Sequence, residues 1–344
     1  MKTAQLTNIR EVSLIEQPIP EPAANEVLVR MKAVGICGSD LHYFLHGGLG
    51  TFKQKMPMSL GHEPAGVIEQ IGPGCNFSIG DRVAIEPLST CGECNYCFKG
   101  LRNLCEKSSF MGSEGAAAGL SEYAVVNVNQ LGLLDSSMTY EEGAMLEPLG
   151  VAYHSINLAN IRLGDKVAVF GAGTIGMLIL EAAKMAGARE TFLIDKLDYR
   201  LQAALELYSP DHVVNERTTD PISFIKNATN GVGVDLAFDA AGVQKTVHGC
   251  FQVAAPGGKV VLVGIPTYDY IKFNPHIARI KELTIINVRR SNQTLDVCIN
   301  LMKKNRVKLR ELVTHRYELG EVQQAFETAG EYNDEVVKAM VIFD

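Results

Sequence analysis

The stretch KVAVFGAGTIG at residues 166–176 decides the fold of the middle of this chain. Lys166–Phe170 is a short apolar run typical of a buried strand, and the pattern after the glycines is helical through Ala186. Residues 191–194 form a second apolar run, which ends at Asp195. A strand, a glycine turn, a helix, a second strand and an acid in this order predict a βαβ unit that binds a dinucleotide.

The surrounding sequence extends this unit into a larger fold. Apolar runs at 234–238 and 259–263 each end in a turn that contains glycine, and helical stretches separate the strands. Alternating strands and helices predict a doubly wound parallel sheet. The first 150 residues differ, because residues 26–34 alternate as a half-buried strand does. The sequence therefore predicts an α/β protein whose first part is rich in strands.

The glycine turn supplies most of the predicted cofactor contacts. Gly171 permits the tight turn, Gly173 lets the backbone approach a pyrophosphate, and Gly176 lets the helix pack on the sheet. The helix N-terminus then offers free N–H groups to the phosphates. The predicted cofactor-binding residues are Gly171, Gly173, Thr174, Ile175, Gly176, Asp195, Arg200 and Gly264.

Asp195 bears on the choice of cofactor. It lies 19 residues after Gly176, where a carboxylate accepts hydrogen bonds from the adenosine ribose and repels a 2′-phosphate. This favours NAD over NADP. Lys196 and Arg200 weaken the inference slightly, because nearby cations can hold a phosphate.

Four of the eight cysteines lie close together in CGECNYCFKGLRNLC. Their spacing is C-x2-C-x2-C-x7-C, and such short loops let thiolates converge on one ion. Iron–sulfur clusters use similar spacings, but zinc is favoured because the fourth cysteine follows within the same lobe and no proline trails it. Four thiolates leave zinc no open position, so this metal is predicted to be structural. The predicted ligands are Cys91, Cys94, Cys97 and Cys105.

A second set of possible metal ligands is spread along the first part of the chain. Cys37 lies in CGSDLH, His62 and Glu63 lie in GHE, and Glu147 begins EPL. Taken alone, such a cysteine or histidine is more often a core residue than a ligand. Beside a dinucleotide fold, these residues predict an open metal site that leaves one position for a substrate oxygen.

Composition and charge exclude several classes of partner. The net charge is −7, and the basic stretch KKNRVKLR at 303–310 is interpreted as a solvated helix end and loop, so no nucleic acid is expected. The N-terminus has no apolar segment of the secretory type. The longest uncharged apolar stretch, 167–180, is short of the roughly 18 residues of a membrane span. We therefore expect a cytoplasmic protein without a membrane partner.

Taken together, these motifs resemble the zinc-dependent medium-chain alcohol dehydrogenase family, and within it the sorbitol and polyol dehydrogenases. The resemblance covers essentially the whole chain and rests on VGICGSDLHY, LGHEPAGVI, GDRVAIEP, the four-cysteine lobe, EPLGVAYH, GAGTIGM and LVTHRYEL. It implies a GroES-like β-barrel catalytic domain formed by residues 1–147 and 291–344, with the zinc lobe at about 88–108. Residues 148–290 would form the Rossmann coenzyme domain.

The resemblance also implies which residues carry the chemistry. Cys37, His62 and a carboxylate would bind a catalytic zinc, and that carboxylate can be Glu63 or Glu147. Ser39 matches the hydroxyl that hydrogen-bonds the substrate oxygen and begins proton removal.

Other matched positions concern the proton path and the substrate. His42 matches a relay toward solvent, with a histidine packed on the cofactor ribose as the alternative. The positions that match the substrate pocket are Tyr43, Phe110 and Arg290. Beside that arginine the family has aromatic residues where this chain has Arg289 and Ser291, which puts the preferred substrate in doubt.

The expected activity is reversible, zinc- and NAD-dependent oxidation of a secondary alcohol in a polyol or sugar-derived substrate. A simple secondary-alcohol or diol dehydrogenase of the same family is the alternative. A zinc-free reductase or binding protein on the same fold is a remote one, which the intact set of metal ligands opposes. The resemblance implies a homodimer or homotetramer, and an open parallel sheet also ends in an edge strand that needs cover.

Overall fold

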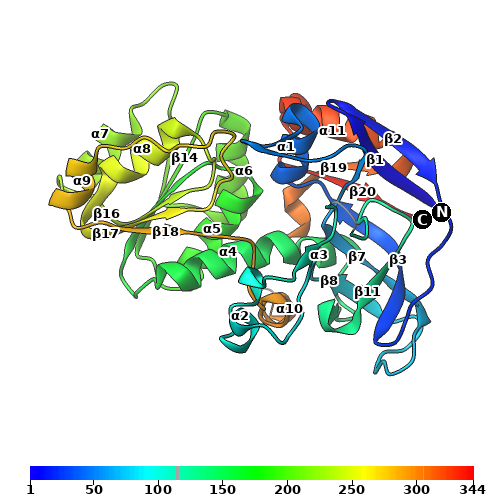
Figure 1. Ribbon diagram of the computed structural model, residues 1–344. Helices are drawn as coiled ribbons and strands as arrows, with labels where there is room; N and C mark the ends of the chain where they lie inside the picture. The colour runs from blue at the N-terminus through cyan, green and yellow to red at the C-terminus, as the bar shows by residue number, and fades with distance from the viewer. Residues whose placement is uncertain (114–115, 305) are drawn as a thin grey trace. The chain divides into compact units, whose positions relative to one another are not determined.

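The computed structural model describes residues 1–113, 116–304 and 306–344, which fold into two compact units (Figure 1). Unit 1 comprises Met1–Gly150 and Asn292–Asp344, and unit 2 comprises Val151–Ser291. Within the described ranges, no helix is both long enough and apolar enough to cross a membrane.

Unit 2 is built around a six-stranded parallel sheet with the order β15-β14-β13-β16-β17-β18. The chain runs outward from β13 first in one direction and then in the other, so the predicted doubly wound sheet is confirmed. The strands are β13 (Lys166–Phe170), β14 (Glu190–Asp195), β15 (His212–Asn215), β16 (Val234–Asp239), β17 (Ala254–Leu262) and β18 (Thr284–Asn287).

Helices cover this sheet and explain why its central strands are almost wholly apolar. The helices are α5 (Thr174–Met185), α6 (Asp198–Tyr208), α7 (Pro221–Ala228), α8 (Gln244–Val253) and α9 (Pro275–Ile280). α5 and α6 pack together and against β13 and β14, whereas α8 packs against α7 and against β16 and β17. Val167, Ala168 and Val169 are fully buried as a result.

Unit 1 joins strands from residues 26–133 to the C-terminal strands in one seven-stranded sheet. Its order is β12-β8-β7-β3-β20-β19, and β11 also pairs with β3. The strands are β3 (Glu26–Gly35), β7 (Glu63–Ile71), β8 (Arg82–Ile85), β11 (Tyr123–Asn127), β12 (Leu131–Leu133), β19 (Val313–Glu318) and β20 (Lys338–Ile342). The C-terminal strand β20 is antiparallel to β3, with Val341 opposite Val34.

Smaller sheets complete unit 1. β1 (Lys2–Asn8) pairs with β2 (Glu11–Glu16) and β6 (Met58–Ser59), while β4 (Gly48–Leu49) pairs with β5 (Phe52–Lys53) and β9 (Leu88–Ser89) with β10 (Ser109–Phe110). The helices are α1 (Gly38–His46), α2 (Asn95–Phe98), α3 (Tyr140–Ala144), α10 (Leu295–Lys303) and α11 (Val322–Glu331), and α4 (Leu146–Ala159) runs from unit 1 into unit 2.

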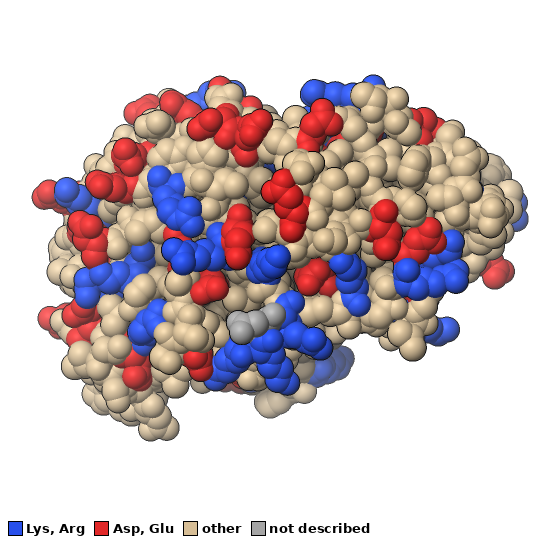
Figure 2. Space-filling view, turned by 180° about the vertical axis from the view of Figure 1, so that it is seen from behind, with Lys and Arg blue, Asp and Glu red and all other residues tan. Residues whose placement is uncertain are grey.

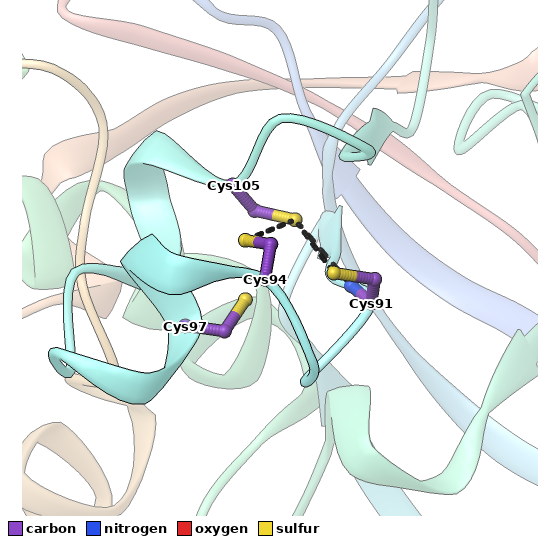
Figure 3. A group of neighbouring side chains, drawn as sticks. All are labelled: Cys91, Cys94, Cys97 and Cys105. Atoms are coloured by element: carbon purple, nitrogen blue, oxygen red, sulfur yellow. Dashed lines mark hydrogen bonds between the residues drawn. The ribbon is translucent and has the colours of Figure 1, made fainter.

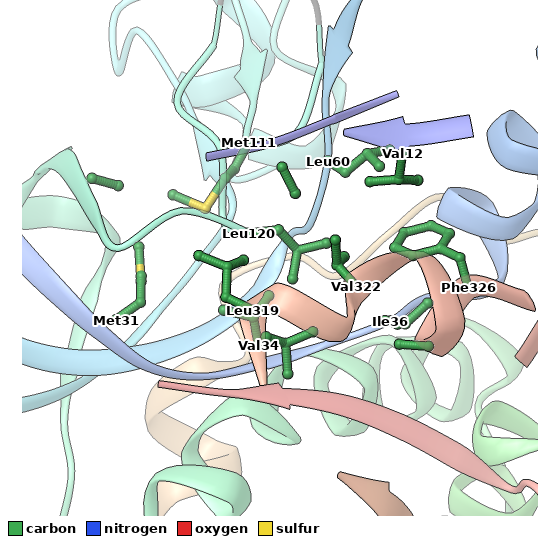
Figure 4. Close-up of a cluster of buried hydrophobic side chains, with 14 of the residues drawn as sticks. Val12, Met31, Val34, Ile36, Leu60, Met111, Leu120, Leu319, Val322 and Phe326 are labelled. Atoms are coloured by element: carbon green, nitrogen blue, oxygen red, sulfur yellow. The ribbon is translucent and has the colours of Figure 1, made fainter. Parts of the chain in front are cut away.

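One apolar core joins the sheets of unit 1 to its helices (Figure 4). Met31 and Val34 of β3 belong to this cluster together with Leu120 and Phe326, and all four side chains are almost completely buried. The ring of Phe326 on α11 lies 5.4 Å from that of Phe44 on α1, centroid to centroid. The core therefore holds α1, which follows the first metal-ligand candidate, against the C-terminal part of the chain.

Most charged side chains lie at the surface. Acidic and basic residues are interspersed over the face shown in Figure 2, and basic side chains gather in one place. The basic stretch after residue 302 is exposed at Lys303, Lys304, Arg306 and Lys308, where α10 ends. Its interpretation as a solvated helix end and loop fits this position.

In the glycine turn after β13, the backbone at Gly176 lies very close to the backbone at Gly171. Gly171 has φ = 108°, which favours glycine. A Cβ atom on Gly176 would lie only 1.7 Å from the carbonyl oxygen of Gly171. Helix α5 can begin this close to the strand only because residue 176 has no side chain.

We predict that Gly176→Ala destabilises the protein by about 1–3 kcal/mol or more, because the new methyl group must displace backbone atoms. The matched control is Gly320→Ala, where an added Cβ would meet no atom within 4 Å. Urea unfolding of both variants and the wild type measures the difference. An equal midpoint for Gly176→Ala and the wild type would contradict this account of the turn.

Candidate metal centres and dinucleotide site

Strand pairing in unit 1 brings three metal-ligand candidates together. Cys37 follows β3 as the N-cap of α1, while His62 and Glu63 stand at the start of β7. Gly35 at the end of β3 is paired with Glu63. The thiol of Cys37, the imidazole of His62 and the carboxylate of Glu63 consequently offer ligand atoms within 4.8 Å of one another.

Asp40 holds this cluster in place, although sequence analysis assigned it no role. Its side chain is fully buried, and one carboxylate oxygen lies 3.4 Å from Nδ1 of His62. The other accepts a hydrogen bond of 3.1 Å from the backbone N–H of Cys37. Burial alone would raise the pKa of Asp40, but His62 and the backbone N–H groups of Cys37 and Gly61 outweigh burial and lower it. Asp40 is therefore an anion that orients the imidazole.

Lys338 of β20 is the second residue of this cluster to which sequence analysis assigned no role. Its ammonium is buried, pairs with Oε2 of Glu63 and donates a hydrogen bond of 2.9 Å to the carbonyl of Ile36. Among the described residues, Oε2 of Glu63 has no hydrogen-bond partner of suitable geometry, so its contact with Lys338 is an ion pair. Burial lowers the pKa of Lys338, but Glu63, Cys37 and Glu147 together outweigh burial and raise it. A lysine inside the apolar run VVKAMVIF was the available sequence signal.

Glu147 lies near this cluster but outside the group of three. It stands in the first turn of α4, and among the described residues it is not one of those whose ligand atoms lie within 4.8 Å of one another. Burial raises the pKa of Glu147 to about 8, and Glu63 adds to the rise while His62 opposes it. Glu147 is thus a largely desolvated carboxyl group within electrostatic range of the candidate ligands.

Two of the predicted substrate-side residues also contact His62. The hydroxyl oxygen of Ser39 lies 3.3 Å from its Nε2, and the ring of Phe110 lies 5.0 Å from the imidazole, centroid to centroid. Tyr43 is half-buried and packs against the core of unit 1. Arg290 belongs to unit 2 and has φ = 58°, an uncommon conformation for a residue other than glycine.

The electrostatics of the cluster suit a bound cation. Burial lowers the pKa of His62, but Asp40 and Cys37 outweigh burial and raise it well above its usual value. The site thus favours positive charge in a buried place. A thiolate, an imidazole and a carboxylate are ligands that zinc commonly takes in catalytic sites. The residues present therefore fit a catalytic zinc.

The four-cysteine lobe forms the second candidate metal centre (Figure 3). Sγ of Cys105 lies 3.5 Å from Sγ of Cys91 and 3.9 Å from Sγ of Cys94, and all four sulfur atoms lie within 4.8 Å of one another. The backbone N–H groups of Cys97 and Glu106 lower the pKa of Cys94 to about 6. Four converging sulfur atoms, one of them already disposed to ionise, fit a closed tetrahedral zinc shell.

The dinucleotide motif in unit 2 has the expected local geometry. Gly173 is the N-cap of α5, so the free N–H groups of that helix begin at Thr174. Asp195 ends β14, and its carboxylate accepts hydrogen bonds from the backbone N–H groups of Ala172 (2.6 Å), Lys196 (2.7 Å) and Leu197 (2.9 Å).

Arg200 and Gly264 were also predicted to bind the cofactor, and they lie at two different places in unit 2. The guanidinium of Arg200 lies 3.6 Å from where a Cβ on Gly173 would be. Gly264 lies so close to Gly242 that a Cβ on it would come within 2.1 Å of the Gly242 nitrogen. The structure thus puts Asp195 and Arg200 beside the glycine turn, and Gly264 at another tight turn of unit 2.

Comparison with known proteins agrees with both halves of this description. Residues 23–136 match the alcohol dehydrogenase GroES-like domain, and residues 174–304 match the zinc-binding dehydrogenase domain. The chain is 34% identical over 342 residues to a sorbitol dehydrogenase of Bacillus subtilis, covering 99% of this chain and 97% of that protein.

Two solved structures share the whole fold. The 2R,3R-butanediol dehydrogenase of Bacillus subtilis has a TM-score of 0.89 and 30% identity, covering 100% of this chain and 99% of that one. A zinc-binding dehydrogenase of Sinorhizobium meliloti bound to NADP has a TM-score of 0.91 and 26% identity, covering 99% of both chains. The chain therefore belongs to the zinc-dependent medium-chain alcohol dehydrogenase family, as its motifs indicated, and is an oxidoreductase of that family with a GroES-like and a Rossmann-type domain.

Proposed function

We propose that this enzyme oxidises a secondary alcohol of a polyol or sugar-derived substrate to a ketone, with NAD as the hydride acceptor. The observation that supports this most directly is the buried group of Cys37, His62 and Glu63, with a second carboxyl, Glu147, nearby. The similarity to a sorbitol dehydrogenase points to the same class of substrate. A complete set of zinc ligands also argues against a zinc-free reductase on this fold.

In this proposal each buried side chain has a defined task. Cys37, His62 and a carboxylate, Glu63 or Glu147, hold the catalytic zinc, which when bound lowers the pKa of the substrate hydroxyl. Asp40 keeps Nε2 of His62 directed at the site, and Lys338 neutralises Glu63. The hydroxyl of Ser39 accepts the substrate proton and passes it on toward His42. Tyr43, Phe110 and Arg290 are proposed to contact the substrate.

In this proposal the two ends of the chain and its middle form domains with different functions. Residues 1–147 and 291–344 form the catalytic domain, and residues 148–290 form the coenzyme domain. The glycine turn, Asp195, Arg200 and Gly264 bind the dinucleotide. The reduced thiols of the four-cysteine lobe suit a cytoplasmic location, where disulfides are rare.

The lobe metal is predicted to support folding and not catalysis. Cys97→Ser should lower the zinc content from about two to about one per chain and reduce thermal stability, because a structural zinc contributes folding energy directly. Cys75→Ser is the matched control, since this thiol donates to the carbonyl of Glu26 outside both metal sites. The zinc content of the purified proteins is measured by metal analysis. An unchanged zinc content in Cys97→Ser would exclude that residue as a ligand.

Cofactor preference should follow the charge of Asp195. Its oxygens accept three backbone hydrogen bonds but keep lone pairs for ribose hydroxyls, while a 2′-phosphate meets a like charge. We expect kcat/KM to favour NAD by roughly 10²-fold, and Asp195→Asn to reduce that ratio, since each charged hydrogen bond contributes about 1–3 kcal/mol. A wild-type preference for NADP would show that the positive charges of Lys196 and Arg200 outweigh the charge of Asp195.

A diol dehydrogenase is the second candidate function, and the similarity to 2R,3R-butanediol dehydrogenase favours it. Glu63 and Glu147 would both offer hard oxygen atoms beside a bound zinc, and such a setting would suit a vicinal diol, which presents two oxygens. We therefore predict that vicinal diols and polyols are oxidised far more efficiently than mono-alcohols of equal length.

Glu147→Ala should lower kcat for a polyol by about 10- to 100-fold, the usual cost of removing a partner around a metal site. The exposed Glu327→Ala is the control. The measurement is kcat/KM for sorbitol, for 2,3-butanediol and for 2-butanol. If the wild type oxidises 2-butanol as efficiently as the polyol, the simple-alcohol alternative replaces the polyol proposal. A preference for 2,3-butanediol over sorbitol would instead favour the diol enzyme.

A homodimer or homotetramer is part of the proposal. Among the described strands, β18 pairs only with β17 and leaves its other edge open. Exposed apolar side chains occur on β18 at Ile285 and in the segment that precedes it at Phe273 and Ile280. A second copy that pairs along β18 would cover both the edge and these side chains. Sedimentation at micromolar concentration should show a species of at least twice the chain mass. Ile285→Lys should shift the equilibrium toward the monomer. A wild type that sediments only as a monomer would refute the proposed assembly.

A further inference from the structure

Helix α1 carries a stripe of three proton-handling side chains from the metal-ligand group to the surface. Ser39, His42 and His46 are spaced by three and four residues, so they lie on one face of the helix in successive turns. Ser39 and His42 are half-buried, whereas His46 in the last turn is exposed. Ser39 is also the residue whose hydroxyl contacts His62. The stripe therefore begins at the candidate ligands and ends in solvent.

The two histidine rings are held close to each other. Their centroids are 6.2 Å apart, and the planes of the two rings are inclined by 29°. The two residues lie in successive turns of the helix. Two rings whose centroids lie 6.2 Å apart are close enough for one water molecule to bridge their nitrogen atoms. Gly47 in the left-handed conformation ends the helix, and Lys53 of β5 binds the carbonyl of His46 at 3.1 Å. The backbone at His46 is thus held at two points, and its imidazole stacks on that of His42.

We infer that His46 is the outer member of a proton relay that delivers the substrate proton to solvent, an inference that rests on the proposed oxidation. The reaction sends a hydride to NAD and releases the hydroxyl proton. That proton leaves Ser39, passes to the imidazole of His42 and then, through water, to His46, which gives it to bulk solvent. Imidazole suits both steps because one of its ring nitrogens can accept a proton while the other donates one.

A purely structural role for His46 is the competing explanation. A histidine in the last turn of a helix can stabilise the negative end of the helix dipole. That role would change stability with protonation but would leave the release of the proton unaffected. The two explanations therefore differ in a kinetic readout.

The test compares proton release with NADH formation in a stopped-flow single turnover, using a pH indicator in weak buffer and an alcohol that the wild type oxidises. His46→Gln should slow proton release by about 3- to 10-fold, less than the ~10²-fold of a buried acid–base group because water can partly replace an exposed donor. Melting temperature and KM should stay unchanged. Added imidazole should restore the rate. His248→Gln, an exposed histidine on α8, is the matched control.

Each outcome separates the relay from the proposed function. Wild-type rates of proton release in His46→Gln, or a slowed release that imidazole does not restore, would overturn the relay while leaving the dehydrogenase intact. A lowered melting temperature with unchanged release would support the dipole explanation and overturn the relay. If the wild type does not reduce NAD with any of the alcohols tested, the proposed function and the relay are both overturned.

Discussion

The register of strand β3 with its neighbours is the constraint on which the proposed catalytic centre depends. β3 pairs with β7 at one edge and with β20 near its end, so three segments distant in sequence meet at Gly35. Cys37 leaves the end of β3, Glu63 begins β7, and Lys338 begins β20. A shift of one residue in either pairing would turn these side chains to opposite faces of the sheet and disperse the group. The apolar core of unit 1 stabilises this register because it buries Met31, Val34 and Leu120.

Burying several ionisable groups at one place costs free energy unless each is compensated. An isolated buried charge is strongly unfavourable, and a buried ion pair is at best weakly stabilising. Here the compensation is specific: Asp40 faces His62 and two backbone N–H groups, while Lys338 faces Glu63 and a carbonyl. The arrangement is therefore more readily understood as a preorganised metal site than as a source of stability. In unit 2, local geometry plays the larger part, since the glycine turn and the carboxylate of Asp195 are joined by hydrogen bonds between neighbouring segments.

The sequence by itself determined those features whose residues lie close together along the chain. The four-cysteine lobe and the glycine turn are closed by short loops, so their spacing already limits their geometry. The strand–turn–helix pattern at residues 166–186 was predicted correctly, and helix α5 indeed spans Thr174–Met185. Recognition of the family from its motifs was also confirmed.

Tertiary structure decided what depends on contacts distant in sequence. Lys338 lies 275 positions after Glu63 and reaches it only because β20 returns to β3. Asp40 stood inside a quoted motif, yet its task is apparent only from its 3.4 Å approach to His62. The separation of Glu63 from Glu147 is likewise a matter of where β7 and α4 begin in space. Local spacing restricts a loop to few conformations, whereas the meeting of distant strands is selected by the packing of the whole core, which no short stretch of sequence contains.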